Sequence, residues 1–142
     1  MKNTILFICT HNSARSQLAE GLVNHRFGAT WEASSAGTEA TVVKPSAIQA
    51  MAEVGIDISH HSSKTIETFQ GQEFDVVVTV CDNARETCPF FPGKRAIHHN
   101  FVDPSRVQGT EKEQLAAFCR TRDEIKAWLD EHLPEWTEEL ER

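Results

Sequence analysis

The sequence has no long apolar run, no excess of basic residues and no internal repeat. No stretch approaches the roughly 20 apolar residues of a membrane-spanning helix, and the apolar run after Met1 is too short for a secretory leader. We therefore expect a cytoplasmic protein that does not enter a membrane. The formal net charge of −7 argues against nucleic acid or an anionic membrane surface as a partner, because both bind basic surfaces.

Linkers and low-complexity segments are also missing from the 142 residues, so we expect one domain spanning residues 1–142 and a monomer. With 39% hydrophobic and 25% charged residues, the composition is that of an ordinary globular protein. Cysteine is scarce, with four residues. In a reducing compartment these thiols are more often catalytic, redox-active or buried than paired in structural disulfides.

Apolar periodicity predicts alternating strands and helices. The predicted strands span residues 5–8, 30–35, 74–80 and 94–100. Helices are predicted at residues 16–27, 45–54, around 64–69 and at 111–132. The last of these should stop before Pro134 and leave an exposed acidic tail. This order is typical of an α/β fold with a four-stranded parallel sheet flanked by helices on both faces.

Residues 9–16, with the sequence CTHNSARS, combine a thiol and a guanidinium in one short loop between a predicted strand and a predicted helix. Consecutive N–H groups and a helix N-terminus can bind an anion there, and Arg15 adds paired donors. Asn12 tolerates the left-handed backbone that such a loop requires. The positive electrostatic field of these N–H groups and Arg15 also favours the thiolate form of Cys9, which the Ser16 hydroxyl can stabilise further. We therefore expect a cysteine nucleophile acting on phosphate or a similar oxyanion; the alternative is a buried Cys9 with a solvated Arg15.

Two further reactive residues, Cys81 and Asp103, also follow predicted strands. The carboxyl ends of parallel strands meet at one edge of a sheet, which places both residues near the loop. For Asp103 the simpler alternative is a turn residue before Pro104.

The stretch from Cys9 to Gln17 resembles the signature loop of the low-molecular-weight protein tyrosine phosphatases, and Asp103-Pro104 matches that family's general-acid motif. The resemblance covers essentially the whole chain. It implies a covalent cysteinyl intermediate on Cys9, an oxyanion bound by Arg15 and a leaving oxygen protonated by Asp103. The implied oxyanion-binding loop consists of Thr10, His11, Asn12, Ser13, Ala14, Arg15 and Ser16.

Residues 81–89, CDNARETCP, resemble the redox segment of the thioredoxin-coupled arsenate reductases, which share the phosphatase fold. This resemblance implies that Cys9 attacks arsenate and that Cys81 then attacks Cys9. Cys88 next takes over the disulfide, and thioredoxin reduces it. The implied partners are arsenate, with phosphate or sulfate as competing oxyanions, and thioredoxin; no cofactor is expected.

A helical conformation of this redox segment conflicts with a disulfide across it. Continuous helix would separate the Cys81 and Cys88 Cα atoms by roughly 10 Å, whereas a disulfide spans at most about 7 Å. We therefore expect the region 81–93 to rearrange on oxidation.

Two other functions remain open. A phosphatase acting on phosphotyrosine or a small phosphate ester would use the same loop. However, that family typically has aromatic residues after the Asp-Pro, where this chain has Ser105-Arg106, and the chain has no tyrosine. Ala14 replaces a cysteine present in many relatives, so the loop cannot form its own disulfide. A non-catalytic oxyanion-binding or redox-sensing module would need no general acid at Asp103.

The sequence gives no support for a metal site. The pairs His60-His61 and His98-His99 are poor chelates, because adjacent strand residues point to opposite faces. Some arsenate reductases bind potassium beside the loop through a carboxylate at the position of Lys64. We expect the Lys64 ammonium to replace that ion. Cys119 lies on an apolar helix stripe and is predicted to be a core residue.

Overall fold

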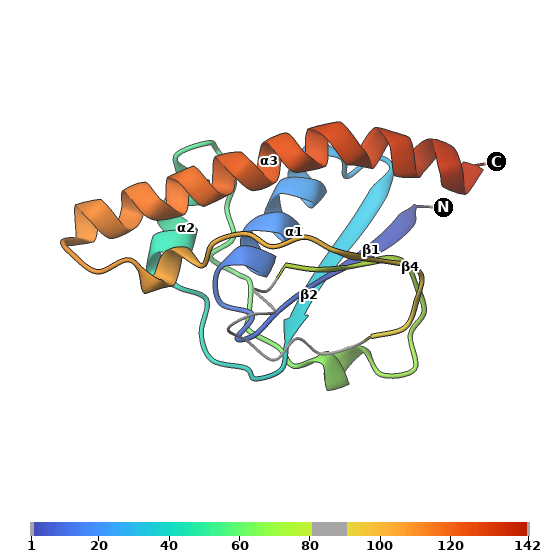
Figure 1. Cartoon of the computed structure of the whole chain (residues 1–142), viewed down its shortest axis with the longest axis horizontal. Helices are drawn as coiled ribbons and strands as arrows, with labels where there is room; N and C mark the ends of the chain where they lie inside the picture. Colours follow the sequence, from blue (N-terminus) through green and yellow to red (C-terminus); the bar gives the residue numbers. More distant parts are fainter. Residues whose placement is uncertain (1, 81–90, 142) are drawn as a thin grey trace.

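The computed structural model describes residues 2–80 and 91–141. Its centre is a four-stranded parallel sheet in the order β2-β1-β3-β4 (Figure 1). The strands are β1 (Asn3–Cys9), β2 (Trp31–Gly37), β3 (Phe74–Thr79) and β4 (Gly93–His98). Each lies within a few residues of its predicted position, and the predicted α/β sheet is confirmed.

The α-helices pack against one face of the sheet and a 3-10 helix against the other. Ile5 and Phe7 share a core with residues of α1 (Arg15–Arg26), α2 (Pro45–Ala52) and α3 (Glu111–Glu141). On the opposite face, Leu6 and Ile8 pack with η1 (Ile66–Phe69). Alternate residues of β1 thus face opposite layers, which explains why residues 5–9 of this strand are apolar and buried.

The predicted end of the last helix before Pro134 is wrong, because α3 continues through this proline to Glu141. A proline inside a helix costs about 3 kcal/mol through the lost hydrogen bond and a steric clash. Apolar burial beyond the proline opposes this cost, since Trp136 is only 3% exposed. The Thr137 hydroxyl adds a hydrogen bond to the Leu133 carbonyl and accepts one from the Trp31 indole. The predicted acidic tail is therefore the final part of the helix: Trp136 is buried, whereas the glutamates at 135, 138, 139 and 141 are exposed as predicted.

The strand order brings distant parts of the chain to the carboxyl end of β1. The chain crosses from β1 to β2 on one side and reaches β3 on the other, so a crevice opens beyond the end of β1. The Val80 N–H donates to the Ile8 carbonyl at 2.9 Å, which holds the chain beyond β3 next to the end of β1. Within the described residues, no helix is both long and apolar enough to cross a membrane.

Candidate active site

A buried thiol lies at the start of the loop between β1 and α1. Cys9 is the last residue of β1 and is 3% exposed. Its Sγ atom lies 2.8 Å from the Ser16 Oγ atom, which also accepts a hydrogen bond from the Asn12 side chain at 2.9 Å. Asn12 has a φ of 51°, the left-handed conformation expected for an anion-binding loop. The structure thus brings these three predicted site residues together.

The carbonyl oxygens of the loop are held by hydrogen bonds that fix the orientation of its peptide groups. Five consecutive carbonyl oxygens accept hydrogen bonds from donors outside the loop: Thr10 from Glu39 N, His11 from Ser63 Oγ, Asn12 from Gln17 Nε2, Ser13 from Lys44 N and Ala14 from Leu18 N. Across a trans peptide, the next N–H points opposite to the carbonyl, and no cis peptide occurs in the described residues. The N–H groups of residues 11–15 therefore face away from these donors, as an oxyanion cradle requires.

Arg15 links the loop to two other segments at this edge of the sheet. Its side chain is 3% exposed. The Nη1 group donates to the carbonyls of Val80 at 3.3 Å and Phe101 at 3.1 Å. Its Nη2 atom lies 3.6 Å from an Asp103 carboxylate oxygen. The guanidinium is therefore fixed by two backbone carbonyls and charge-paired with Asp103.

Asp103 precedes the short helix η2 (Pro104–Arg106) and is held in place from two sides. One carboxylate oxygen accepts from the Ser105 N–H at 3.0 Å and the Ser105 hydroxyl at 2.6 Å. The other faces Arg15 and lies 3.8 Å from the Arg106 Nε atom. The residue caps η2, as a turn residue would, but its contact with Arg15 also places it at the site.

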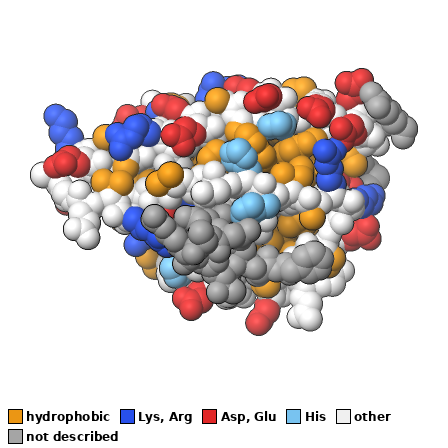
Figure 2. Space-filling view, in the orientation of Figure 1, with side chains coloured by type: hydrophobic (Ala, Val, Ile, Leu, Met, Phe, Trp, Pro, Cys, Tyr) orange, Lys and Arg blue, Asp and Glu red, His pale blue; other side chains and the backbone are white. Residues whose placement is uncertain are grey.

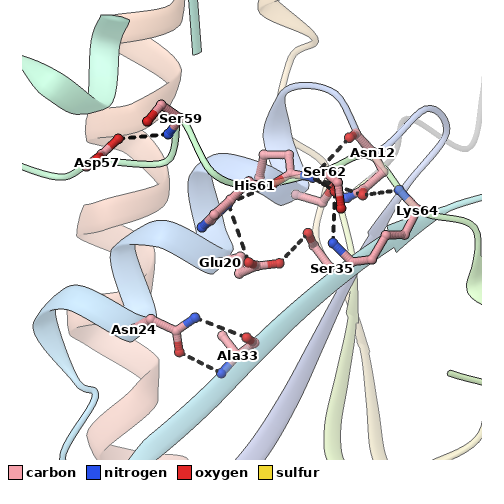
Figure 3. A network of polar contacts seen from close by, with 12 residues as sticks. Asn12, Glu20, Asn24, Ala33, Ser35, Asp57, Ser59, His61, Ser62 and Lys64 are labelled. Atoms are coloured by element: carbon pink, nitrogen blue, oxygen red, sulfur yellow. Dashed lines mark hydrogen bonds and ion pairs between the residues drawn. The ribbon is translucent and has the colours of Figure 1, made fainter. Parts of the chain in front are cut away.

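A polar network behind the loop was not foreseen from the sequence (Figure 3). The Gln17 side-chain amide donates to the Asn12 side chain at 2.9 Å, and its oxygen Oε1 lies 2.9 Å from His61 Nδ1. The same His61 nitrogen lies 3.4 Å from Glu20, which accepts from the Ser35 hydroxyl at 2.6 Å. These contacts support Asn12 through residues far apart in sequence. The spacing of residues 17 and 20 on one helix was the only available signal.

Burial controls the protonation of His61. Removal from water lowers the pKa of His61 below its ordinary 6.5, although the nearby Glu20 carboxylate opposes this effect. The neutral imidazole can donate from Nδ1 to the Gln17 side-chain oxygen Oε1. The network therefore contains a neutral histidine at neutral pH.

Gly37 is another residue of the site that the sequence alone did not identify. A Cβ atom at this position would lie 2.7 Å from the Thr10 carbonyl oxygen and 2.8 Å from the Asn12 nitrogen. Only glycine allows the end of β2 to approach the loop this closely.

Lys64 lies beside the loop, as expected. Its backbone N–H donates to the Asn12 side chain at 2.8 Å, and its ammonium group donates to the Ser62 carbonyl at 2.9 Å (Figure 3). Within residues 2–80 and 91–141, no group of three or more histidine, cysteine, aspartate or glutamate side chains is arranged to hold a metal ion.

The other cysteines fall into two groups. Cys81 and Cys88 lie outside the described residues, so their predicted roles and the predicted rearrangement of the region 81–93 on oxidation stay predictions. Cys119 is a free thiol, packed only partly against the core and 3.8 Å from a Glu53 carboxylate oxygen. Burial raises the pKa of the Cys119 thiol, which disfavours its reactive thiolate form.

A cavity of about 810 Å³ opens above the loop. Its described lining is mostly polar and includes Thr10, His11, Ser13, Thr38, Glu39, Thr41, Val42, Lys44, Asp103, Ser105 and Arg106. His11 is partly exposed and lies 3.5 Å from Glu39. This described lining contains no phenylalanine, tyrosine or tryptophan that could stack on an aryl group.

This is an α/β domain of the class that carries a buried cysteine and a buried arginine in one loop between the first strand and the first helix. The chain is a member of the low molecular weight phosphotyrosine protein phosphatase family, whose model matches residues 4–142. The resemblance found in the loop is thereby confirmed.

The relatives also support the arsenate reductase resemblance. The chain is 47% identical over 125 residues to the arsenate reductase of Halalkalibacterium halodurans, covering 87% of this chain and 90% of that protein. A solved structure of an arsenate reductase in the phosphate binding state matches with a TM-score of 0.79 and 30% identity, covering 95% of this chain and 98% of that one. The thioredoxin-dependent arsenate reductase of Corynebacterium glutamicum matches with a TM-score of 0.70 and 27% identity, over 99% of this chain and 64% of that one.

Proposed function

We propose that the protein reduces arsenate to arsenite by a relay of three thiols. The Cys9 thiolate attacks arsenate bound by the loop and Arg15, and Asp103 protonates the departing oxygen. Cys81 then attacks the Cys9 sulfur; the electron pair of the sulfur–arsenic bond passes to arsenic, and arsenite leaves. The resulting Cys9–Cys81 disulfide is attacked by Cys88, which frees Cys9 and leaves a Cys81–Cys88 disulfide.

The observation that carries this proposal is the geometry around Cys9. Its sulfur lies 2.8 Å from a hydroxyl, at the start of a loop whose carbonyl oxygens bind donors outside the loop. A buried arginine and an aspartate, Arg15 and Asp103, complete the site at 3.6 Å from each other. These are the groups required to bind a tetrahedral oxyanion, attack it and protonate the leaving oxygen. The named arsenate reductases among the relatives support arsenate as that oxyanion.

The final electron donor in the proposal is thioredoxin. Its dithiol reduces the Cys81–Cys88 disulfide and is itself oxidised to a disulfide, which balances the two electrons given to arsenic. The similar thioredoxin-dependent reductase of Corynebacterium glutamicum supports this choice. Such a cycle requires a reducing compartment, so we place the protein in the cytoplasm. Each proposed catalytic residue belongs to one chain, and we propose a monomer.

The test is arsenate-dependent oxidation of NADPH in the presence of thioredoxin and thioredoxin reductase. The wild type and Cys119→Ser should turn over at similar rates, because Cys119 lies outside the site. Cys88→Ser should stop after a single turnover with a Cys9–Cys81 disulfide, detectable by mass spectrometry. Replacing the thioredoxin system with glutathione and glutaredoxin distinguishes the two reductants.

A phosphatase is the second candidate, because the same loop and Asp103 could cleave a phosphate ester. The family match supports it, but the described cavity lining offers no ring to stack on phosphotyrosine. Hydrolysis of an aryl phosphate that is fast in both the wild type and Cys81→Ser, without arsenate turnover, would establish the phosphatase and reject the reductase.

A further inference from the structure

The segment that carries Asp103 lies along α3. We call residues 99–106 the strap; it runs from the end of β4 to the end of η2 beneath α3 (Figure 1). The His99 N–H donates to the Thr79 carbonyl at 2.9 Å, so the strap begins at the sheet. Beyond this point it leaves the sheet, and its buried side chains Phe101 and Pro104 anchor it. η2 packs directly against α3.

An aromatic cluster joins the strap to the helix. Trp128 stacks on His99 with centroids 4.8 Å apart and an interplanar angle of 26°, and meets Phe101 edge-on at 5.7 Å. On its other sides Trp128 contacts His132 at 5.0 Å and Trp136 at 5.4 Å. Figure 2 shows histidines set among hydrophobic side chains on this face. Trp128 is therefore held by its own helix while it contacts two residues of the strap.

The strap residue packed most deeply in this cluster also binds the oxyanion arginine. Phe101 is 4% exposed, and its carbonyl accepts from Arg15 Nη1 at 3.1 Å. Two residues later Asp103 faces the other end of the same guanidinium at 3.6 Å. The position of Arg15 thus depends on where the strap lies.

We propose that Trp128 is a positioning residue for the oxyanion site, acting through Phe101 on Arg15. The stack with His99 and Phe101 fixes the Phe101 carbonyl, and this carbonyl holds the guanidinium at the loop. The inference rests on the proposed oxyanion role of Arg15. It adds a determinant on α3 that touches neither substrate nor loop.

The test measures the dissociation constant for inorganic phosphate by 31P NMR, alongside the unfolding free energy. Trp128→Leu removes the stack and should weaken phosphate binding about threefold to tenfold, the range expected for losing an aromatic pair. Trp128→Phe keeps a ring and should restore most of the affinity. His99→Ala removes the partner on the strap while leaving α3 unchanged, and should weaken binding in the same direction.

The matched control is Trp31→Phe. Trp31 is buried and anchors the far end of α3 through its hydrogen bond to Thr137 at 2.8 Å, away from the strap. This variant should lose stability but keep its phosphate affinity. Equal phosphate affinity in the wild type, Trp128→Leu and His99→Ala would overturn the inference, as would an equal loss in Trp31→Phe. A wild type that binds no phosphate would overturn the proposed function as well.

Discussion

The Ser16 Oγ atom lies 2.8 Å from the Cys9 sulfur and also accepts a hydrogen bond from Asn12. With the Asn12 amide donating to its oxygen, the Ser16 hydroxyl hydrogen is free to point at the sulfur. A hydrogen bond to a charged group contributes about 1.5–3 kcal/mol. We therefore expect the Ser16 hydroxyl to donate to the Cys9 sulfur during the proposed reaction.

Ser16→Ala should slow the reaction of Cys9 with iodoacetamide at neutral pH by about tenfold or more, from the loss of this hydrogen bond. Mass spectrometry of the Cys9 peptide over time gives the rate without interference from the other cysteines. Ser16→Thr retains a hydroxyl and serves as the control. An unchanged rate in the alanine variant would show that the hydroxyl does not stabilise the thiolate.

Asp103→Asn should separate catalysis from binding. The amide cannot donate the proton required by the leaving oxygen, so kcat should fall about a hundredfold or more. The substitution also removes a negative charge 3.6 Å from Arg15, which competes with the oxyanion. Phosphate should therefore inhibit the variant at the same or lower concentration than the wild type. A kcat close to the wild-type value would remove Asp103 from the mechanism.

Gly37→Ala should displace the loop, because the added Cβ meets backbone atoms of Thr10 and Asn12 closer than 3 Å. We expect a destabilisation of about 1–3 kcal/mol and a loss of phosphate binding. Gly55→Ala is the control: Gly55 has a φ of 80° with open space around it, so alanine strains the backbone far from the loop. If both variants bind phosphate normally, the close approach of Gly37 is not needed.

The stability of the protein should decrease as the pH falls below about 6.5, the ordinary pKa of histidine. The pKa of His61 is lowered in the folded protein, so the unfolded chain takes up a proton first. His61 therefore contributes no loss of stability above its ordinary pKa and an increasing loss as the pH falls toward its folded pKa. Burial also lowers the pKa of His99, so this residue changes the stability in the same direction.

His61→Gln isolates the contribution of His61 to this pH dependence, because His99 is present in both the variant and the wild type. Urea unfolding at pH about 5.5 and about 7.5 should show a smaller difference in unfolding free energy for this variant than for the wild type. Identical differences would mean that His61 does not become harder to protonate on folding.

Potassium should not raise the arsenate reduction rate at constant ionic strength. The Lys64 ammonium already lies beside the loop, where it donates to the Ser62 carbonyl at 2.9 Å. Lys64→Asp replaces this positive charge with a carboxylate, and the rate of that variant should increase with potassium. Comparison of potassium chloride with choline chloride gives the answer; a clear potassium response in the wild type would contradict the expected role of Lys64.

The sequence by itself determined the sheet, the approximate positions of the helices and the resemblance of residues 9–17 to the signature loop of the family. These features are local: strand and helix patterns record which faces are buried, and one short loop contains the thiol, the arginine and the consecutive N–H groups. Asp103 follows a predicted parallel strand, and this position also placed it near the site. The roles of Cys81 and Cys88 come from sequence alone and stay predictions.

Only the tertiary structure decided which distant residues hold the loop. The carbonyls of Val80 and Phe101 accept from Arg15, and Gly37 allows β2 to approach the loop; none of these pairings leaves a periodic signal. Tertiary packing also explains why α3 continues through Pro134: burial of Trp136 outweighs the local tendency of proline to end a helix. Local propensity fixes short segments, whereas packing between segments fixes the geometry of the site.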